Sequence, residues 1–382
     1  MNNLTTQLQS DRADRGVSRR NFGRIAAMLS AGASLPLFTE PGLAQLSQIR
    51  GKIPDDAVMI NSNENPLGPC PEALEAVRSI AVKGGRYLFN LTSEFEELLA
   101  EQEGLKRNYV KAYAGSSAPL MQSAVAFTSP EKAFVTGDPG YEAGENSARG
   151  MGAPVVRVPL TKTYAHDVRA MIEKGQNAGL FYICNPNNPS GTVTPQADIR
   201  WLVENKPKDS VVLIDEAYTH ISNEPFNSDL VAQDKDVVIL RTFSKIYGMA
   251  GLRAGAALGR PDLLQKLGKL SGGMMPITGM VAATASLKAK DLIPERRKKI
   301  GMVRNDLHAF LDKHSIKYVP SVSNCIMIDV APKSTDQVIA GLQKEKVYVG
   351  RVWKSWPTKV RVTIGLQSEM DQFKAAFLKV MA

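Results

Sequence analysis

The stretch "DVVILRTFSKIYGMAGLRAG", Asp236 to Gly255, joins an apolar run to a loop that holds one lysine, Lys245, among small and apolar residues. The run "DVVIL" is typical of a strand covered on both faces, because it lacks the alternation of a half-exposed strand. Lysine is rarely buried, since removing its ammonium from water is costly. A solvated loop lysine is the ordinary interpretation, and an amine that reacts with a carbonyl is the more specific one.

Similar apolar runs precede this stretch, namely "KAFVTG" at 132–137, "VVRVPL" at 155–160, "GLFYIC" at 179–184 and "VVLID" at 211–215. Helical segments such as "TPQADIRWLVEN" lie between them. This alternation predicts an α/β fold with a mostly parallel sheet flanked by helices. We expect this large domain over residues 82–288. An N-terminal arm and part of a smaller domain would come before it, at 45–81.

From residue 289 the pattern becomes that of a small α+β domain, which we expect to span 289–382. A long amphipathic helix with Ile300 and Leu307 on its apolar stripe comes first. The strand candidates "CIMIDV" and "VRVTI" follow it. Capping boxes predict helix starts at Ser93, with Glu96 as partner, and at Ser368, with Asp371 as partner.

The composition limits the possible functions. The chain has 382 residues, of which 43% are hydrophobic and 22% charged, as in globular proteins of two domains. The net charge of +9 is scattered, and its only dense cluster, "ERRKK" at 295–299, is expected to be a solvated helix face. No nucleic-acid motif is present, so we expect no nucleic-acid partner. The three cysteines and four histidines lack metal-ligand spacing, which indicates neither a metal site nor a disulfide framework.

The first 44 residues differ from the rest. "SRRNFGR", Ser18 to Arg24, precedes the weakly apolar run "IAAMLSAGASLPLF", and small residues, "GLA", end the segment at 42–44. This pattern resembles a twin-arginine export signal, and the apolar run is too short for stable membrane insertion. We therefore expect a leader at 1–44 and a periplasmic or exported protein. A basic helical tail on a cytoplasmic protein is the alternative.

Polar residues follow several of the predicted strands, where ligands bind in open parallel sheets. Asp215 ends "VVLID", and an asparagine-rich turn follows "GLFYIC". "YAGSSAPL" offers hydroxyls and free N–H groups at an apparent helix start, and Thr242, Ser244 and Arg253 surround Lys245. Together these groups suit a ligand with a phosphate, a ring nitrogen, a ring oxygen and an aldehyde, which describes pyridoxal 5′-phosphate.

Five motifs carry a family resemblance. They are "NSNENPLGP" at 61–69, "NPNNPSGT" at 185–192, "IDEAY" at 214–218, "TFSKIYGMAGLRAG" at 242–255 and "VRVTIG" at 360–365. In this order they resemble the class I/II aminotransferases of the fold-type I pyridoxal-phosphate superfamily, and most of all the histidinol-phosphate aminotransferase branch. The resemblance covers about residues 54–382.

The resemblance implies that Lys245 forms a Schiff base with the cofactor, that Asp215 binds the ring nitrogen, and that Tyr218 binds the ring oxygen. The remaining implied cofactor contacts are Ser116, Ser117, Tyr141, Asn188, Thr242, Ser244 and Arg253, and Tyr87 would reach the phosphate of the neighbouring subunit in a homodimer. The implied substrate contacts are Arg361 with the α-carboxylate, Arg351 near the side chain, and Asn65.

The resulting prediction is transamination between an amino acid, or an amino-acid-like amine, and a 2-oxo acid. Two alternatives stay open at this level. The same lysine and aspartate serve other pyridoxal-phosphate reactions, such as those of a lyase, decarboxylase, racemase or oxidase. A periplasmic binding protein without catalysis is the other alternative. The donor is open as well, because an exported enzyme would not meet histidinol phosphate in the cytosol.

Overall fold

The computed structural model describes residues 53–270 and 273–382, and its larger part is built on a seven-stranded sheet of order β2-β8-β7-β6-β5-β3-β4. The strands are β2 (Val110–Tyr113), β3 (Ala133–Asp138), β4 (Val155–Pro159), β5 (Ala178–Cys184), β6 (Val211–Asp215), β7 (Val237–Thr242) and β8 (Gly255–Gly259). Strands β3 to β7 are parallel, which confirms the expected fold class. Strand β8 is antiparallel to both of its neighbours.

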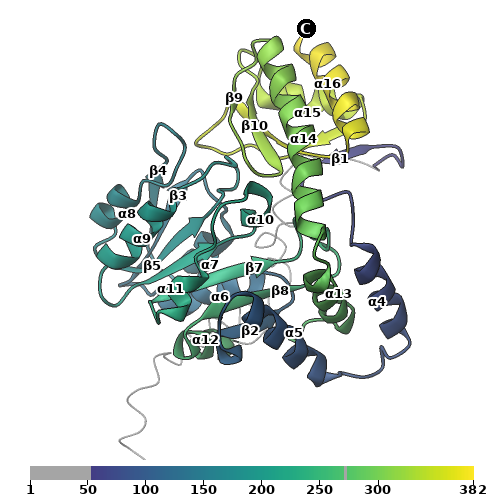
Figure 1. The fold of residues 1–382 in the computed structure, drawn as a ribbon. Coiled ribbons are helices and arrows are strands. Elements are labelled where there is room, and N and C mark those ends of the chain that lie inside the picture. Colours follow the sequence, from purple (N-terminus) through teal and green to yellow (C-terminus); the bar gives the residue numbers. More distant parts are fainter. Residues whose placement is uncertain (1–52, 271–272) are drawn as a thin grey trace, which may run out of the picture.

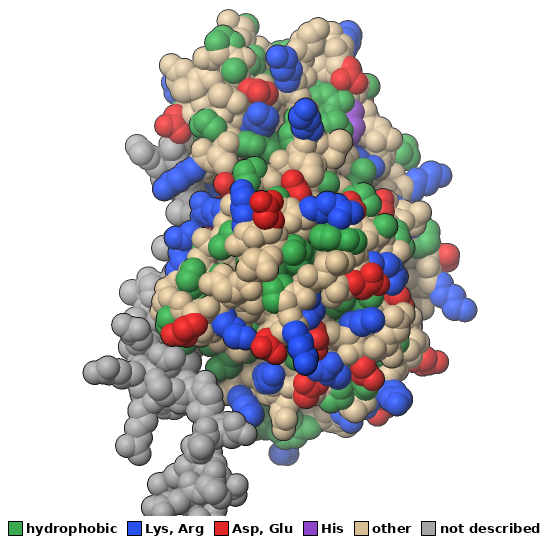
Figure 2. Space-filling model, turned by 90° about the vertical axis from the view of Figure 1, so that its left-hand side faces the viewer, with side chains coloured by type: hydrophobic (Ala, Val, Ile, Leu, Met, Phe, Trp, Pro, Cys, Tyr) green, Lys and Arg blue, Asp and Glu red, His purple; other side chains and the backbone are tan. Residues whose placement is uncertain are grey.

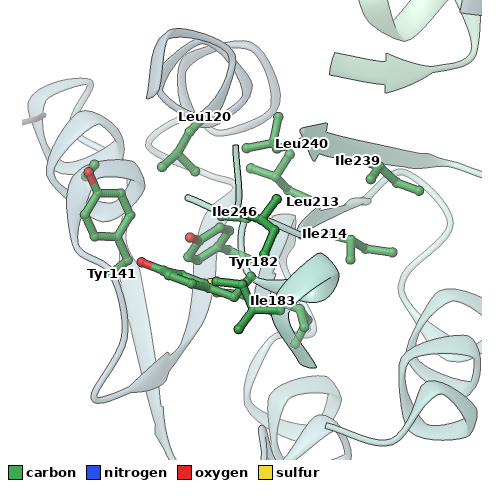
Figure 3. Packing of buried hydrophobic residues seen from close by; sticks show 14 of the residues in the cluster. Leu120, Tyr141, Tyr182, Ile183, Leu213, Ile214, Ile239, Leu240 and Ile246 are labelled. Atoms are coloured by element: carbon green, nitrogen blue, oxygen red, sulfur yellow. The ribbon is translucent and has the colours of Figure 1, made fainter. Parts of the chain in front are cut away.

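The centre of this sheet is apolar because β5, β6 and β7 are buried along their whole length. Figure 3 shows this packing with Ile183 from β5, Leu213 and Ile214 from β6, and Ile239 and Leu240 from β7. These are the Val- and Ile-rich runs that the sequence marked as strands covered on both faces. The short strands β2 and β8 were not predicted, since "VKAY" and "GAALG" lack that signal.

Helices flank the large sheet (Figure 1). They are α5 (Phe89–Gln102), the 3-10 turn η2 (Arg107–Tyr109), α6 (Ser117–Phe127), α7 (Ala143–Gly150), α8 (Val168–Lys174), α9 (Gln196–Asn205), α10 (Thr219–Ser222), α11 (Ser228–Ala232), α12 (Pro261–Gly268) and α13 (Ile277–Lys288). Helix α4 (Pro71–Ala81) packs on α13, which also packs on α5.

The smaller part holds an antiparallel sheet of order β12-β10-β9 and a parallel pair, β1 with β11. Its strands are β1 (Val58–Ile60), β9 (Tyr318–Val319), β10 (Cys325–Asp329), β11 (Val347–Val349) and β12 (Lys359–Thr363), and its helices are α14 (Leu292–Lys313), α15 (Thr335–Lys344) and α16 (Gln367–Met381). Figure 1 shows β1, in purple, beside the yellow C-terminal elements. The N-terminal arm thus joins the C-terminal part, while the domain boundaries themselves stay predictions.

Both predicted capping boxes are wrong. Helix α5 begins at Phe89, so Ser93 lies inside it, and its hydroxyl accepts a 2.9 Å hydrogen bond from Arg107 Nη2. A side chain 14 positions away thus uses the oxygen that a cap would need. Helix α16 begins at Gln367, before Ser368, because the Glu369 carboxylate accepts from the Leu366 amide at 2.6 Å. The proposed partner Asp371 instead pairs with Lys374 at 2.8 Å.

The basic cluster at 295–299 is only partly solvated, contrary to the expectation. It lies in α14, where Arg296 is 7% exposed and donates from Nη1 to the Ile246 carbonyl at 2.9 Å. Arg297 Nε donates to the His220 carbonyl at 2.8 Å. On the face that Figure 2 shows, basic and acidic side chains are interspersed.

Within the described residues, no helix is both long and apolar enough to cross a membrane. These residues also contain no group of three or more His, Cys, Asp or Glu side chains arranged to hold a metal ion. Cys70, Cys184 and Cys325 are buried, and none of the three is in a disulfide.

Candidate active site

The carboxyl ends of β5, β6 and β7 meet at one edge of the sheet, where Cys184 pairs with Asp215 in register. A pocket of about 610 Å³ opens there. Its lining residues are Ile53, Asn61, Ser62, Glu64, Ser116, Ser117, Tyr141, Cys184, Asn188, Asp215, Ala217, Tyr218, Thr242, Ser244, Lys245, Ala250, Gly251 and Arg253. All the predicted cofactor contacts except Tyr87 are in this set. Residues far apart in the sequence therefore converge as the strand-end argument requires.

Asp215 is a buried carboxylate with fixed orientation. It is 5% exposed, its Oδ2 accepts from the Tyr182 hydroxyl at 3.0 Å, and its Oδ1 accepts from the Ala217 amide at 3.2 Å. Burial, together with this carboxylate, raises the pKa of Tyr182 well above its ordinary value. The phenol therefore stays protonated and donates to Asp215. A carboxylate oxygen has more than one lone pair, so Asp215 can also accept a hydrogen bond from a ligand in the pocket.

Lys245 is also buried, at 8% exposure, so the solvated-loop interpretation is wrong. Its Nζ lies 5.5 Å from the centroid of the Tyr218 ring. The Tyr218 hydroxyl accepts a 3.2 Å hydrogen bond from Asn63 Nδ2. A lysine and a phenol thus share one wall of the pocket, close to a buried carboxylate, which is a setting for amine chemistry and proton transfer.

The loop after Lys245 is held from outside the pocket. The Ile246 carbonyl accepts from Asn65 Nδ2 at 3.0 Å and from Arg296 Nη1 at 2.9 Å. Gly248 has φ +67°, and a Cβ there would lie 2.1 Å from the Gly68 carbonyl oxygen. Only glycine fits this approach of the chain, so the loop conformation follows from contacts with distant segments.

The opposite end of the pocket is suited to an anion. Helix α6 begins at Ser117, so its first N–H groups have no partner within the helix, and Ser116, Ser117 and Thr242 line this end of the pocket. Arg253 donates to the Ala250 carbonyl at 2.8 Å and to the Ala114 carbonyl at 3.1 Å. Burial lowers the pKa of Arg253. Both of these acceptors are neutral carbonyls, so the guanidinium can still take a negatively charged ligand.

Two glycines make room for this end of the pocket. Gly115 has φ +88°, and a Cβ on it would lie 2.3 Å from Arg253 Nη2. A Cβ on Gly255 would lie 2.7 Å from the Gly115 carbonyl carbon. The antiparallel strand β8 can therefore lie directly behind the loop that bears Ser116. The hydroxyls, the helix start and the guanidinium together form an anion cradle, which fits the phosphate of pyridoxal phosphate.

Arg361 lies behind the pocket wall rather than on its surface. It is 1% exposed, its Nη1 donates to Asn188 Oδ1 at 2.9 Å, and its Nη2 donates to the Asn61 carbonyl at 2.8 Å. Asn188 and Asn61 both line the pocket. The guanidinium is therefore one residue away from the space where a substrate carboxylate would lie.

Besides Arg361, three predicted site residues do not line the pocket. Tyr87 is 72% exposed on the segment before α5. Asn65 donates from Nδ2 to the Ile246 carbonyl, on the loop that follows Lys245. Arg351 forms an ion pair with Glu142. Asn65 and Arg351 thus make contacts outside the pocket, and Tyr87 faces solvent. None of the three lines the pocket of its own chain.

The sequence interpretation missed several lining residues. Asn61, Ser62 and Glu64 line the pocket and belong to the quoted motif "NSNENPLGP", but no role was assigned to them. Cys184 ends β5, and burial, with the nearby Asp215 charge, raises the pKa of its thiol. The position of Cys184 at a strand end was a usable signal, while Ile53 carries none.

Comparison with known proteins agrees with this geometry. The chain matches the family "Aminotransferase class I and II" over residues 55–377. It is 31% identical over 334 residues to a histidinol-phosphate aminotransferase of Moorella thermoacetica, covering 86% of each chain. It is 31% identical over 323 residues to an aromatic amino acid aminotransferase of Cutibacterium acnes, covering 83% of this chain and 91% of the relative.

A solved structure resembles this one closely. It is the histidinol-phosphate aminotransferase of Sinorhizobium meliloti in complex with pyridoxal-5′-phosphate, with a TM-score of 0.77 and 26% sequence identity. The alignment covers 84% of this chain and 90% of that one. The pocket described above has a buried amine, a buried carboxylate and an anion cradle, so its residues fit the same cofactor.

These matches confirm the predicted fold, the predicted enzyme class and pyridoxal phosphate as the cofactor. Matching over residues 55–377, the chain belongs to the class I and II aminotransferases, which carry out transamination with pyridoxal phosphate.

Proposed function

We propose that the enzyme exchanges an amino group between an amino acid, or an amino-acid-like amine, and a 2-oxo acid, with Lys245 as the proton-transferring amine. The observation that carries this proposal is that Lys245 and Asp215, both nearly buried, line one pocket whose other end is suited to a phosphate. When bound, pyridoxal phosphate supplies an aldehyde for amines and a ring that accepts the electrons left as Cα loses its proton.

Each pocket residue has a role in this proposal. Lys245 holds the cofactor and moves a proton at the substrate Cα. Asp215 keeps the ring nitrogen protonated, and Tyr182 orients that carboxylate. Tyr218 and Asn188 donate toward the ring oxygen. The phosphate is bound by Ser116, Ser117, Thr242, Ser244 and Arg253, and Tyr141 stacks on the ring.

Arg361 is assigned to the substrate α-carboxylate. Its present hydrogen bond to Asn188 Oδ1 is 2.9 Å long and connects it to a pocket residue. A carboxylate that enters beside Asn188 would compete for the guanidinium with a neutral amide. Charge-assisted bidentate pairing favours the carboxylate in that competition.

We further propose a homodimer with shared active sites. Tyr87 and Phe89 are 72% and 65% exposed, and their rings stack with centroids 5.5 Å apart. Two exposed aromatic side chains on one segment are typical of an interaction surface. In a two-fold dimer, Tyr87 of the partner subunit would reach the phosphate end of this pocket.

We also propose that the enzyme acts outside the cytoplasm. This rests on the sequence of residues 1–44, which lie outside the described residues. Pyridoxal phosphate is made in the cytosol, and the pocket that fits it is assembled only in the folded chain. A twin-arginine route, which carries folded proteins, would let the cofactor bind before export.

A donor and acceptor screen tests the proposed activity. Purified holoenzyme is incubated with amino acids and 2-oxo acids in pairs, and both products are identified by mass spectrometry. Transamination yields the matching 2-oxo acid and new amino acid together. Lys245→Ala should lose this exchange and the visible absorbance of the bound cofactor. Product from one substrate alone, as in decarboxylation, would contradict the proposal.

A further inference from the structure

Arg351, which was expected near the substrate side chain, forms a bidentate ion pair. It lies just after β11 and is 7% exposed. Its Nη1 donates to Glu142 Oε1 at 2.8 Å, and its Nη2 donates to Glu142 Oε2. Both members are mostly buried, with side-chain exposures of 7% and 20%. Such fork-to-fork pairs are geometrically specific and strong.

This pair lies next to the substrate end of the site. The Arg351 Cζ lies 4.0 Å from the centroid of the Trp353 ring, and the Arg361 Cζ lies 5.3 Å from the same centroid. Trp353 is held in place because its Nε1 donates to the Gly140 carbonyl at 3.0 Å. One indole ring therefore contacts both guanidinium groups, the one assigned to the α-carboxylate and the one paired with Glu142.

Neighbouring carboxylates have other partners. Glu145, one helical turn beyond Glu142, accepts from Arg157 Nε at 3.0 Å. Asp138 Oδ1 accepts from the Ser355 hydroxyl at 3.0 Å. Glu142 is thus the carboxylate that meets Arg351 among the described residues, and the pair has no net charge.

We propose that Glu142 determines side-chain specificity, because it neutralises Arg351 and so favours amino donors with uncharged side chains over those with phosphate or carboxylate side chains. This inference rests on the proposed function. An anionic side chain would have to take Arg351 from Glu142, leaving a mostly buried carboxylate without its cation, which is costly. An uncharged side chain leaves the ion pair intact.

The test uses matched donors with the holoenzyme. The pairs are glutamate and glutamine, aspartate and asparagine, and histidinol phosphate and histidinol, and kcat/KM is measured for each. The wild type should prefer the uncharged member of each pair. Glu142→Gln keeps the size of the side chain and removes its charge. The kcat/KM of the anionic donor, divided by that of the uncharged donor, should therefore rise about tenfold. Glu142→Gln combined with Arg351→Gln should cancel that gain, because the cation is gone.

Glu145→Gln is the matched control, since Glu145 pairs with Arg157, and its ratio should equal that of the wild type. A wild type that prefers the anionic members overturns the inference, even if Glu142→Gln fails to fold. An unchanged ratio in folded Glu142→Gln overturns it too. Absence of turnover with every donor, charged or uncharged, would instead contradict the proposed function.

Discussion

The Tyr182 hydroxyl donates a 3.0 Å hydrogen bond to Asp215 Oδ2, from one strand of the sheet to the next. This bond orients the carboxylate that we assign to the cofactor's ring nitrogen. It also separates two roles of Asp215. An asparagine can accept from the Ala217 amide with its oxygen and donate from its nitrogen to the Tyr182 hydroxyl oxygen, but it cannot keep a ring nitrogen protonated.

Asp215→Asn is therefore expected to fold with stability close to the wild type and to lose turnover by roughly 100-fold or more. Asp215→Ala should lose similar activity and also stability, by about 1–3 kcal/mol, because Tyr182 loses its buried acceptor. Steady-state kinetics and thermal unfolding measure the two effects. Normal turnover in Asp215→Asn would leave Asp215 with only the structural role of accepting from the Ala217 amide.

Asn65 and Arg296 are expected to act as positioning residues for Lys245, because both donate to the Ile246 carbonyl. Asn65→Ala and Arg296→Met should each lower kcat by about tenfold, and the double variant should lose less than the sum of the two effects, since they share an acceptor. They should also shift the pH profile of kcat, which a purely structural change would not move.

Arg297→Met is the matched control for that pair, because Arg297 lies on the same helix and donates to the His220 carbonyl. It should leave the pH profile unchanged. Identical profiles in all the variants would show that the Ile246 contacts do not position the lysine.

Two histidines, the buried His166 and the half-buried His220, predict a loss of stability in acid. Burial lowers the pKa of His166 and of His220 from 6.5 to about 4. The lowered pKa means that neutral histidine stabilises the fold fully above pH 6.5, and that this contribution falls as the pH drops toward 4. Each histidine lowers the free energy of unfolding by an amount on the order of 3 kcal/mol between pH 6.5 and pH 4.

The measurement is the unfolding midpoint as a function of pH. His166→Gln cannot titrate, so its stability should fall less between pH 6.5 and 4 than that of the wild type, whatever its stability at pH 7. Parallel curves for the two proteins would mean that His166 does not supply this pH dependence.

A shared active site is expected to show complementation between subunits. Tyr87→Ala and Lys245→Ala should each have little activity as pure dimers. Mixed dimers should regain it, because one pocket then has Lys245 of its own chain and Tyr87 of the partner subunit. Activity is measured after the two variants are unfolded and refolded together. A fully active monomer at working concentration would refute the shared site.

Export is expected to depend on Arg19 and Arg20. The double variant Arg19→Lys, Arg20→Lys should stay in the cytosol of the native host and remain folded, yellow and active, since all the lining residues of the pocket lie from Ile53 onward. The mature protein should begin near Gln45, which fractionation and N-terminal sequencing can check. A wild type found only in the cytosol with residues 1–44 intact would remove the export proposal.

The sequence alone determined the buried central strands and the chemistry at their ends. The apolar runs that became β5, β6 and β7 are buried along their whole length, and such a run predicts its own strand without reference to any partner. Asp215 and Lys245 could be predicted for the same reason, because a polar residue at or after the end of a buried parallel strand lies at the ligand edge wherever the other strands are.

Only the tertiary structure decided which distant groups meet. Arg351 pairs with Glu142 across 209 positions, and Arg361 donates to Asn61 across 300. Ser93 looked like a cap, but Arg107 takes its oxygen, and Arg296 looked solvated, but it binds the Ile246 carbonyl. A local sequence pattern reflects only the helix or strand propensity of its residues and the spacing of its apolar positions. An ion pair or a hydrogen bond between segments depends on the distance between them, which exists only once the chain is folded.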